Sequence, residues 1–297
     1  MNGRGINAHI STKQDIDNVV LCGCEWIRID FDWKTIEPKK GQYNWNVFDT
    51  AVSYAYSKGL KIYASLAYTP SWINSDFRAC PNMSNWVSFC QKVASRFSSR
   101  ITVYGLWNEP NLKDFYSGSK NDYIKIILEG GYNAIKNVNK NFLVAAGDLA
   151  TSNKSDWYDW FKLLKKHTDI FDIFSWHTYQ DSSNEVISRY KLGKIPIIGW
   201  IVPKWRPFKW EIDDIRKKKN KQIFLTETGL KARTNKSSEL KDQKDFVKDL
   251  EKIRKETDST AIFIYELNDD KNINDKWGIF DESKNPKQSA QWLIENK

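Results

Sequence analysis

Several residue types and segment types are scarce in this sequence. Its 297 residues include only 3 His, 4 Cys and 2 Met. The longest apolar run, residues 195–203, is far shorter than the roughly 18 residues of a membrane-spanning helix. The first five residues lack the apolar core of a secretory signal. We therefore expect no membrane segment, and no export signal is visible.

The scarcity of cysteine and histidine excludes two kinds of site. Four cysteines are too few for a disulfide-rich scaffold. Cys22 and Cys24 form a Cys-x-Cys pair, but no second pair and no nearby histidine completes a zinc site. We expect buried reduced thiols, and a Cys80–Cys90 bridge stays open as the alternative. The histidines are scattered, at His9, His167 and His177, so we expect no metal and no cofactor.

Positive charge and aromatic side chains, in contrast, are abundant. Lys+Arg number 46 and Asp+Glu 37, which gives a net charge of +9. The basic residues are interspersed with acidic ones and form only one block, 217–219, so a nucleic-acid partner is not expected. The 14 Trp, 13 Tyr and 15 Phe favour a ligand with flat apolar faces, such as a sugar. The net charge favours an anionic ligand, although a lysine-rich surface has the same charge without that function.

Strand-like and helix-like patterns alternate along the whole chain. Strands are predicted at 2–10, 25–33, 60–68, 101–107, 142–146, 171–177, 222–226 and 260–267. Helical patterns follow near 48–59, 86–97, 122–136, 157–164, 212–219, 240–255 and 289–294. Repeated strand–helix units form parallel sheets, and about eight of them predict a closed (β/α)₈ TIM barrel. We expect one α/β domain over residues 1–297, without a linker.

One segment interrupts this alternation. Residues 192–210 contain three prolines and three tryptophans without a regular spacing. Long loops inside compact domains are commonly functional or disordered, and the aromatic residues favour function. We predict a long aromatic-rich loop between strands six and seven that contributes to a ligand cleft.

Two glutamates follow strongly apolar strands. Glu109 comes after the fourth predicted strand and Glu227 after the seventh. In a barrel the carboxyl ends of the strands meet at one mouth, so both side chains are expected there. Hydrolysis of a glycosidic bond needs one carboxyl group to protonate the leaving oxygen and another to act on the anomeric carbon. Asn108 could hold a sugar hydroxyl, and Arg28 could keep a neighbouring carboxylate ionised.

These residues lie in motifs that resemble a known group of enzymes. WNEPN at 107–111 resembles the acid/base strand of clan A glycoside hydrolases, and FLTETG at 224–229 resembles their nucleophile strand. The pattern is most similar to glycoside hydrolase family 39 and related exopolysaccharide-degrading glycosidases, and families 5 and 113 share much of it. Supporting motifs are GINAH (5–9), WIRID (26–30), IEP (36–38), GQYNW (41–45), AYTPSW (67–72), WHTY (176–179), IYELNDD (264–270) and WGIF (277–280).

The resemblance implies a retaining mechanism with two glutamates. Glu109 would be the general acid and then the base, and Glu227 would be the nucleophile. Arg28 and Tyr179 would hydrogen-bond Glu227 and favour its charged form. Asn108 would hold the sugar 2-hydroxyl. His177 would line the same subsite.

Other side chains at the strand ends have weaker claims to a role. Glu266 is the chief rival of Glu227, but it lacks the Thr-Glu-Thr-Gly setting and is expected to be a substrate or structural contact. Asp30 and Asp32 are expected to anchor loops. His9 could contact a sugar or be a structural histidine. Trp72 and Trp277 are candidate platforms for stacking a sugar ring.

Several alternatives remain open at this stage. A barrel that only binds glycans would have lost one of the two glutamates, and both are present. A barrel acting on phosphorylated metabolites would carry a glycine-rich site after strands seven and eight. In this chain the loop after strand seven has only Gly229, and strand eight ends in the acidic segment 266–270, which would repel phosphate. We expect a monomer that cleaves an oligo- or polysaccharide, endo-acting, with an exo-acting β-glycosidase such as a β-xylosidase as the alternative. An extracellular or periplasmic location is typical of glycan hydrolases.

Overall fold

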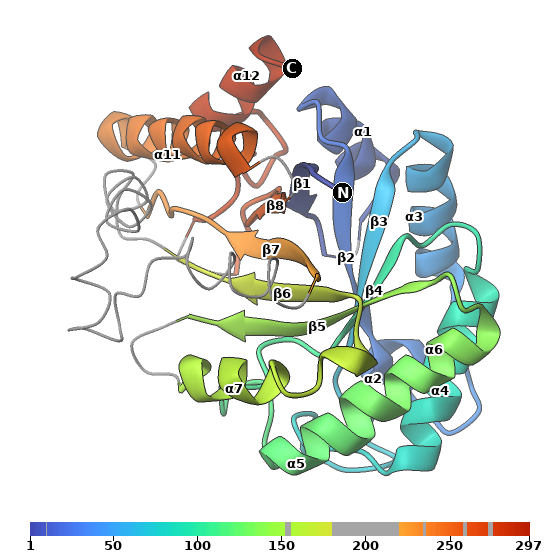
Figure 1. Ribbon diagram of the computed structural model, residues 1–297. Helices are drawn as coiled ribbons and strands as arrows, with labels where there is room; N and C mark the ends of the chain where they lie inside the picture. Colours follow the sequence, from blue (N-terminus) through green and yellow to red (C-terminus); the bar gives the residue numbers. More distant parts are fainter. Residues whose placement is uncertain (10, 152–155, 180–219, 234–235, 258–259, 273–275) are drawn as a thin grey trace, which may run out of the picture.

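The chain folds into a closed barrel of eight parallel strands, which are hydrogen-bonded in chain order from β1 to β8 (Figure 1). The computed structural model describes residues 1–9, 11–151, 156–179, 220–233, 236–257, 260–272 and 276–297. The strands are β1 (Gly3–Asn7), β2 (Trp26–Asp32), β3 (Lys61–Ala67), β4 (Val103–Leu106), β5 (Leu143–Ala150), β6 (Ile173–His177), β7 (Gln222–Thr228) and β8 (Thr260–Ile264). This architecture confirms the predicted (β/α)₈ barrel. The predicted loop at 192–210 and helix at 212–219 lie outside the described residues.

The described helices lie around the outside of the barrel (Figure 1). They are α1 (Lys13–Leu21), α2 (Trp33–Ile36), α3 (Asn46–Ser57), α4 (Met83–Arg96), α5 (Lys120–Asp122), the π-helix η1 (Tyr123–Gly130), α6 (Gly131–Val138), α7 (Trp157–Leu164), the 3₁₀ helix η2 (Thr168–Ile170), α11 (Ser237–Thr257) and α12 (Gln288–Glu295). Helix α1 was not expected from the sequence. None of the helices described is long and apolar enough to cross a bilayer.

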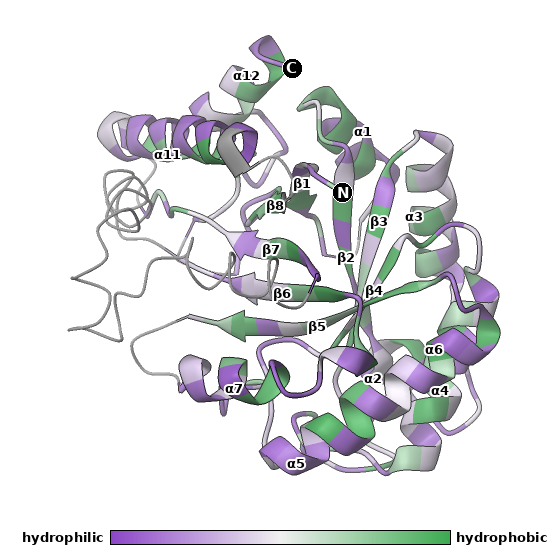
Figure 2. Ribbon diagram, viewed as in Figure 1, coloured by the Kyte–Doolittle hydropathy of each residue, from purple (hydrophilic) through white to green (hydrophobic). Residues whose placement is uncertain are grey.

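The main hydrophobic core lies between the strands and the helices. On β2, Ile27, Ile29 and Phe31 are buried in this core. Trp33, at the start of α2, stacks on Phe89 of α4 with ring centroids 4.7 Å apart. In Figure 2 hydrophobic and hydrophilic residues alternate along the strands, and helix α11 is coloured largely as hydrophilic. This core fixes the positions of the strand ends, where the polar side chains of interest lie.

The interior of the barrel is layered. Trp26, Tyr63, Phe224 and Phe263 belong to a second apolar cluster. Gly5 leaves room for these rings, because a Cβ there would lie 2.6 Å from Phe263. Side chains two residues apart on a strand point to the same side. The next positions on the same side of β2, β3 and β7 are polar: Arg28, Ser65 and Thr226.

The strand ladders are irregular in one part of the barrel. The register shifts between Gly147 and Leu149 where β5 pairs with β6, and similar shifts occur in the β6–β7 and β7–β8 ladders. Asp148 is the extra residue of the first shift, and its φ is +41°. A bulge re-aims the side chain that it carries. In this way Asp148 enters the polar layer.

Candidate active site

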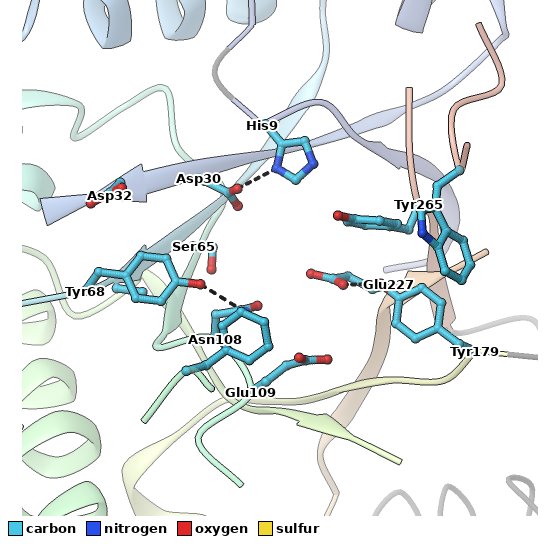
Figure 3. Close-up of a pocket in the computed structure, with 13 residues that line it drawn as sticks. His9, Asp30, Asp32, Ser65, Tyr68, Asn108, Glu109, Tyr179, Glu227 and Tyr265 are labelled. Atoms are coloured by element: carbon cyan, nitrogen blue, oxygen red, sulfur yellow. Dashed lines mark hydrogen bonds and ion pairs between the residues drawn. The ribbon is translucent and has the colours of Figure 1, made fainter. Parts of the chain in front are cut away.

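Two buried glutamates meet at the mouth of the barrel (Figure 3). Glu109 follows β4 and Glu227 lies on β7, and each is 7% exposed. One carboxylate oxygen of Glu109 and one of Glu227 lie within 4.8 Å of each other. Retaining glycosidases hold their two carboxyl groups about 5–5.5 Å apart, and inverting ones about 6.5–9.5 Å. The short distance between these two oxygens is compatible with the separation found in retaining enzymes.

Arg28 and Tyr179 hold Glu227 from two sides. Arg28 donates from Nη1 to Glu227 Oε1, and the Tyr179 hydroxyl donates to Glu227 Oε2. Arg28 is only 1% exposed. Its Nη2 donates to Asn108 Oδ1 over 2.9 Å, and Asn108 Nδ2 donates to the Tyr68 hydroxyl over 3.2 Å. The structure thus brings the predicted partners of Glu227 together and orients the amide of Asn108.

His177 lies beneath the two glutamates rather than in the cavity. It is fully buried, and its Nδ1 is 2.9 Å from Glu109 Oε1 and 3.4 Å from Glu227 Oε2. Burial opposes protonation of this ring, but Glu227, Asp148 and Glu109 raise the pKa of His177 to about 10. The sequence predicted that His177 lines a sugar subsite. In the structure it is not among the cavity-lining residues, and it acts on the two carboxyl groups from behind.

The environments of the two glutamates differ in a way that suits acid–base chemistry. Burial and the nearby charge of Glu227 raise the pKa of Glu109, although His177 opposes this shift. Glu227, in contrast, accepts hydrogen bonds from a guanidinium and a phenol. Of the two, Glu109 is therefore the group whose surroundings favour holding a proton, as an acid catalyst requires.

His9 bridges two carboxylates on the opposite wall. Its Nδ1 is 2.6 Å from Asp30 Oδ2, and its Nε2 is 2.7 Å from Glu266 Oε2. Burial lowers the pKa of His9, but Asp30 and Glu266 raise it, and the net result lies well above the usual range. Both ring nitrogens are therefore occupied by protein groups. Glu266, the predicted rival of Glu227, contacts this imidazole and also lines an adjoining cavity of about 600 Å³.

The cavity beside Glu109 and Glu227 has a volume of about 440 Å³. Its described lining is mainly carboxylate and aromatic: Asp30, Asp32, Glu109, Glu227, Tyr68, Phe115, Tyr179, Tyr265 and Trp277, with His9, Ser65, Ala67 and Asn108. Trp277 lines it as predicted and packs edge-on against Tyr179, with centroids 5.1 Å apart. Trp72 is not brought to this cavity. Its indole N–H donates to the Glu37 carbonyl oxygen, and its ring packs against Trp33.

Glu109, His177 and Glu227 also form a set of potential metal ligands, because one ligand atom of each lies within 4.8 Å of the others. The donor chemistry favours ion pairing over coordination. An imidazolium ring has no free lone pair for a metal, and the neighbouring carboxylates favour that charged form of His177. Arg28 already occupies one oxygen of Glu227.

The sequence reasoning missed two features of the site. Asp148 was missed because the fifth strand was expected to end at residue 146, whereas β5 continues to Ala150. Tyr68 and Tyr265 were read only as parts of longer motifs, and both line the cavity. Tyr68 and Glu109 also have left-handed backbone conformations, with φ of +74° and +43°. Such strain gathers at functional sites, but it has no signature in the sequence pattern.

Comparison with known proteins gives one family and several related folds. Residues 1–270 match the family described as cellulase (glycosyl hydrolase family 5). A family 39 glycoside hydrolase from Bacteroides cellulosilyticus WH2 superposes with a TM-score of 0.72 at 17% identity, covering 98% of this chain and 62% of that one. This chain therefore spans about three fifths of that protein's length.

Two further solved structures share the architecture. Xylanase 10B from Thermotoga petrophila RKU-1 has a TM-score of 0.70 and 18% identity, covering 99% of this chain and 94% of that one. An exo-beta-1,4-mannosidase from Opitutaceae bacterium strain TAV5 has a TM-score of 0.69 and 12% identity, covering 99% of this chain and 59% of that one. At these identities the likeness establishes a common fold.

Proposed function

This chain belongs to the cellulase family, glycosyl hydrolase family 5, and on that premise we propose that it cleaves β-glycosidic bonds in an oligo- or polysaccharide with retention of configuration. The proposal is carried by one observation, the pair of buried carboxyl groups whose oxygens lie within 4.8 Å of each other. Their spacing suits a direct attack by one of them on the anomeric carbon.

In the first step Glu227 attacks the anomeric carbon while the leaving oxygen takes the proton of Glu109. Arg28 and Tyr179 hold both oxygens of Glu227, so the nucleophile is fixed before the substrate binds. Such preorganisation lowers the barrier because little has to be reoriented during the reaction. Asn108, whose amide lines the cavity, is placed to contact the sugar 2-hydroxyl, where hydrogen bonds strengthen in the transition state.

In the second step a water molecule takes the place of the leaving group and attacks the anomeric carbon, which breaks the ester bond and releases the carboxylate of Glu227. Glu109 has lost its proton and now accepts one from this water. The same side chain therefore acts first as an acid and then as a base. The N–H of His177 that contacts Glu109 Oε1 over 2.9 Å holds the group in place through both steps.

The nature of the glycan is a finer part of the proposal. The net charge of +9 favours attraction of an anionic polymer. The described lining of the cavity instead carries four carboxyl groups and one imidazole, which favours a neutral sugar at the bond that is cleaved. The row of aromatic side chains at the cavity supports several sugar subsites and hence endo action.

The test is the release of new reducing ends from a panel of neutral and acidic β-linked polysaccharides. The wild type is compared with Glu227→Gln, and Glu266→Gln serves as a matched variant at the rival carboxylate. We expect the wild type and Glu266→Gln to release reducing ends, and we expect Glu227→Gln to release none above background. Loss of activity only in Glu266→Gln would reject the nucleophile assignment. Binding of a glycan without cleavage by the wild type would support a barrel that only binds.

Two features of the products test the finer claims. Proton NMR of the first product formed shows whether the β-anomer is retained, and an initial α-anomer would reject the double displacement. A ladder of intermediate oligosaccharides supports endo action. Steady release of one small sugar from a chain end would instead show an exo enzyme.

A further inference from the structure

Asp148 is a buried carboxylate for which the two steps above have no role. It is 1% exposed and lies at the bulge of β5, below the cavity and behind the two glutamates. Its backbone also belongs to the site, because its carbonyl oxygen accepts a hydrogen bond of 3.1 Å from the backbone N–H of Glu109. A buried charge is costly unless other groups compensate it, so its partners indicate what it does.

Four side chains surround this carboxylate. The hydroxyl of Thr226 donates to Oδ1 over 2.6 Å, and the hydroxyl of Tyr63 lies 3.0 Å from the same oxygen. Two ion pairs complete the shell: Arg28 Nη2 lies 3.6 Å from Oδ2, and His177 Nε2 lies 3.7 Å from Oδ1. Among the described residues Nε2 of His177 has no hydrogen-bond partner, and Asp148 forms an ion pair with it over 3.7 Å, whereas Nδ1 faces Glu109 and Glu227.

The titratable groups in and around this layer come from six strands or the loops that follow them: Arg28, Tyr63, Glu109, Asp148, His177, Tyr179 and Glu227. Burial raises the pKa of Tyr63 and of Tyr179 well above the usual range, so both phenols stay neutral. Arg28 and an imidazolium at His177 supply two positive charges. Asp148 and Glu227 supply two negative charges, so the charges of these seven groups balance when Glu109 keeps its proton. The charge of Asp30 also acts on Arg28 and Asp148, and this carboxylate is paired with His9.

We propose that Asp148 is a positioning residue that compensates the charge of His177 and Arg28, and thereby keeps Glu109 in its protonated, proton-donating form before the bond is cleaved. The inference rests on the proposed function. The positive and negative charges of these groups also balance in the second step. Esterification removes the charge of Glu227, and Glu109 has by then given its proton to the leaving oxygen and carries a negative charge, so the sum over the seven groups is again zero.

Replacing Asp148 by Asn keeps the shape of the side chain and removes its charge. The layer then carries one excess positive charge, which loss of a proton from either Glu109 or His177 would cancel; while His177 stays charged, the excess falls on Glu109 and lowers its pKa. Removing an opposite charge at this distance lowers a pKa by about 1–3 units. We expect the alkaline limb of the pH profile of kcat/KM, which reports the acid form of Glu109, to move to lower pH. We also expect kcat at neutral pH to fall more than KM changes.

Nitrogen NMR of the imidazole rings tests the same point without any substrate. The chain has only three histidines, so the signals can be assigned with single His→Gln variants. In the wild type the His177 ring is expected to remain an imidazolium up to about pH 9, and in Asp148→Asn its titration moves to lower pH by about one unit or more. The control is Tyr63→Phe, which removes a hydrogen bond to the same carboxylate and leaves every charge in place.

The outcomes separate this inference from the proposed function. A wild-type His177 that titrates near the ordinary pKa of about 6.5 would overturn the charge assignment, even if Asp148→Asn does not fold. An unchanged His177 titration in a folded Asp148→Asn would overturn the role of Asp148. So would a shift of equal size in Tyr63→Phe, because the effect would then be structural. If no glycan is cleaved, the proposed function fails, but the imidazole titration still shows whether Asp148 compensates the charge of His177.

Discussion

Arg28 is the side chain whose loss should disturb this protein most. It is 1% exposed and donates hydrogen bonds to Glu227, Asn7, Ser65 and Asn108, and it lies 3.6 Å from Asp148. Arg28→Met keeps the aliphatic part and removes the guanidinium from two buried carboxylates, Glu227 and Asp148. Breaking a buried ion pair in this way costs about 3–5 kcal/mol. At about 2 °C for each kcal/mol in a chain of this size, the melting temperature should fall by about 6–10 °C.

The pH dependence of this loss has a defined sign. Burial raises the pKa of Asp148, but His177, Arg28 and Thr226 outweigh it and hold that pKa well below the usual range. The stabilisation is therefore present above the unfolded pKa of about 3.9, and it is lost as the pH falls through the lower folded value. Without Arg28 the buried carboxylates are more easily protonated in acid. The difference in unfolding free energy between wild type and Arg28→Met should be largest at pH 7 and smaller near pH 4.5.

Urea unfolding followed by tryptophan fluorescence at both pH values measures this difference. Ser65→Ala is the matched control, because it removes one neutral partner of the same guanidinium and should cost only about 0.5–1.5 kcal/mol. The reasoning would be refuted by an Arg28→Met variant no less stable than Ser65→Ala at pH 7. A deficit that grows towards acid pH would refute it as well.

Three further predictions concern separate parts of the molecule. Glu109→Gln should lose about 10²–10⁴-fold in kcat on natural glycans but far less on aryl glycosides with good leaving groups, and a stopped-flow comparison of the two substrates checks this. Trp33→Ala, in the core between α2 and α4, should lower the unfolding free energy by about 3–5 kcal/mol in urea titrations; a loss below 1 kcal/mol would contradict the packing. The four cysteines are free thiols. Burial raises the pKa of Cys80 to about 11 and that of Cys22 to about 12. A disulfide reagent at pH 8 should therefore react slowly with the folded protein, and it should label all four thiols once the protein is unfolded.

The barrel was predictable because each strand is a short apolar segment between turn signals. All eight predicted strands overlap the observed ones. Helix α1 was missed because it has only two buried apolar side chains, Ile16 and Val19. Its capping box pairs Thr12 with Asp15 instead of the more familiar glutamate. A helix that is largely polar gives little periodic signal.

The candidate site was predictable to the extent that it follows the rule of strand ends. Glu109, Asn108 and Glu227 lie at the barrel mouth, as does Arg28 beneath them. The rule does not say how deeply a side chain is buried below the mouth. His177 was therefore expected to line the cavity, and it is found fully buried instead. A bulge breaks the two-residue alternation on which strand predictions depend, and this is why Asp148 was invisible. The direction of Trp72 depends on the fold of its loop, which carries no periodic pattern.

The shifts of register divide the barrel into two halves, one with regular ladders and one with interrupted ladders. Among the described ladders, pairing is regular from β8 through β1 to β5, and it is interrupted at the three ladders between β5 and β8. A bulge leaves backbone groups outside the ladder, and segments with fewer paired groups open at lower free energy. Amide hydrogens at the carboxyl ends of β5, β6 and β7 should therefore exchange with solvent sooner than those of β2 and β3. Glu227, the proposed nucleophile, then belongs to the half expected to open more readily, and Arg28, which holds it, belongs to the half expected to stay closed.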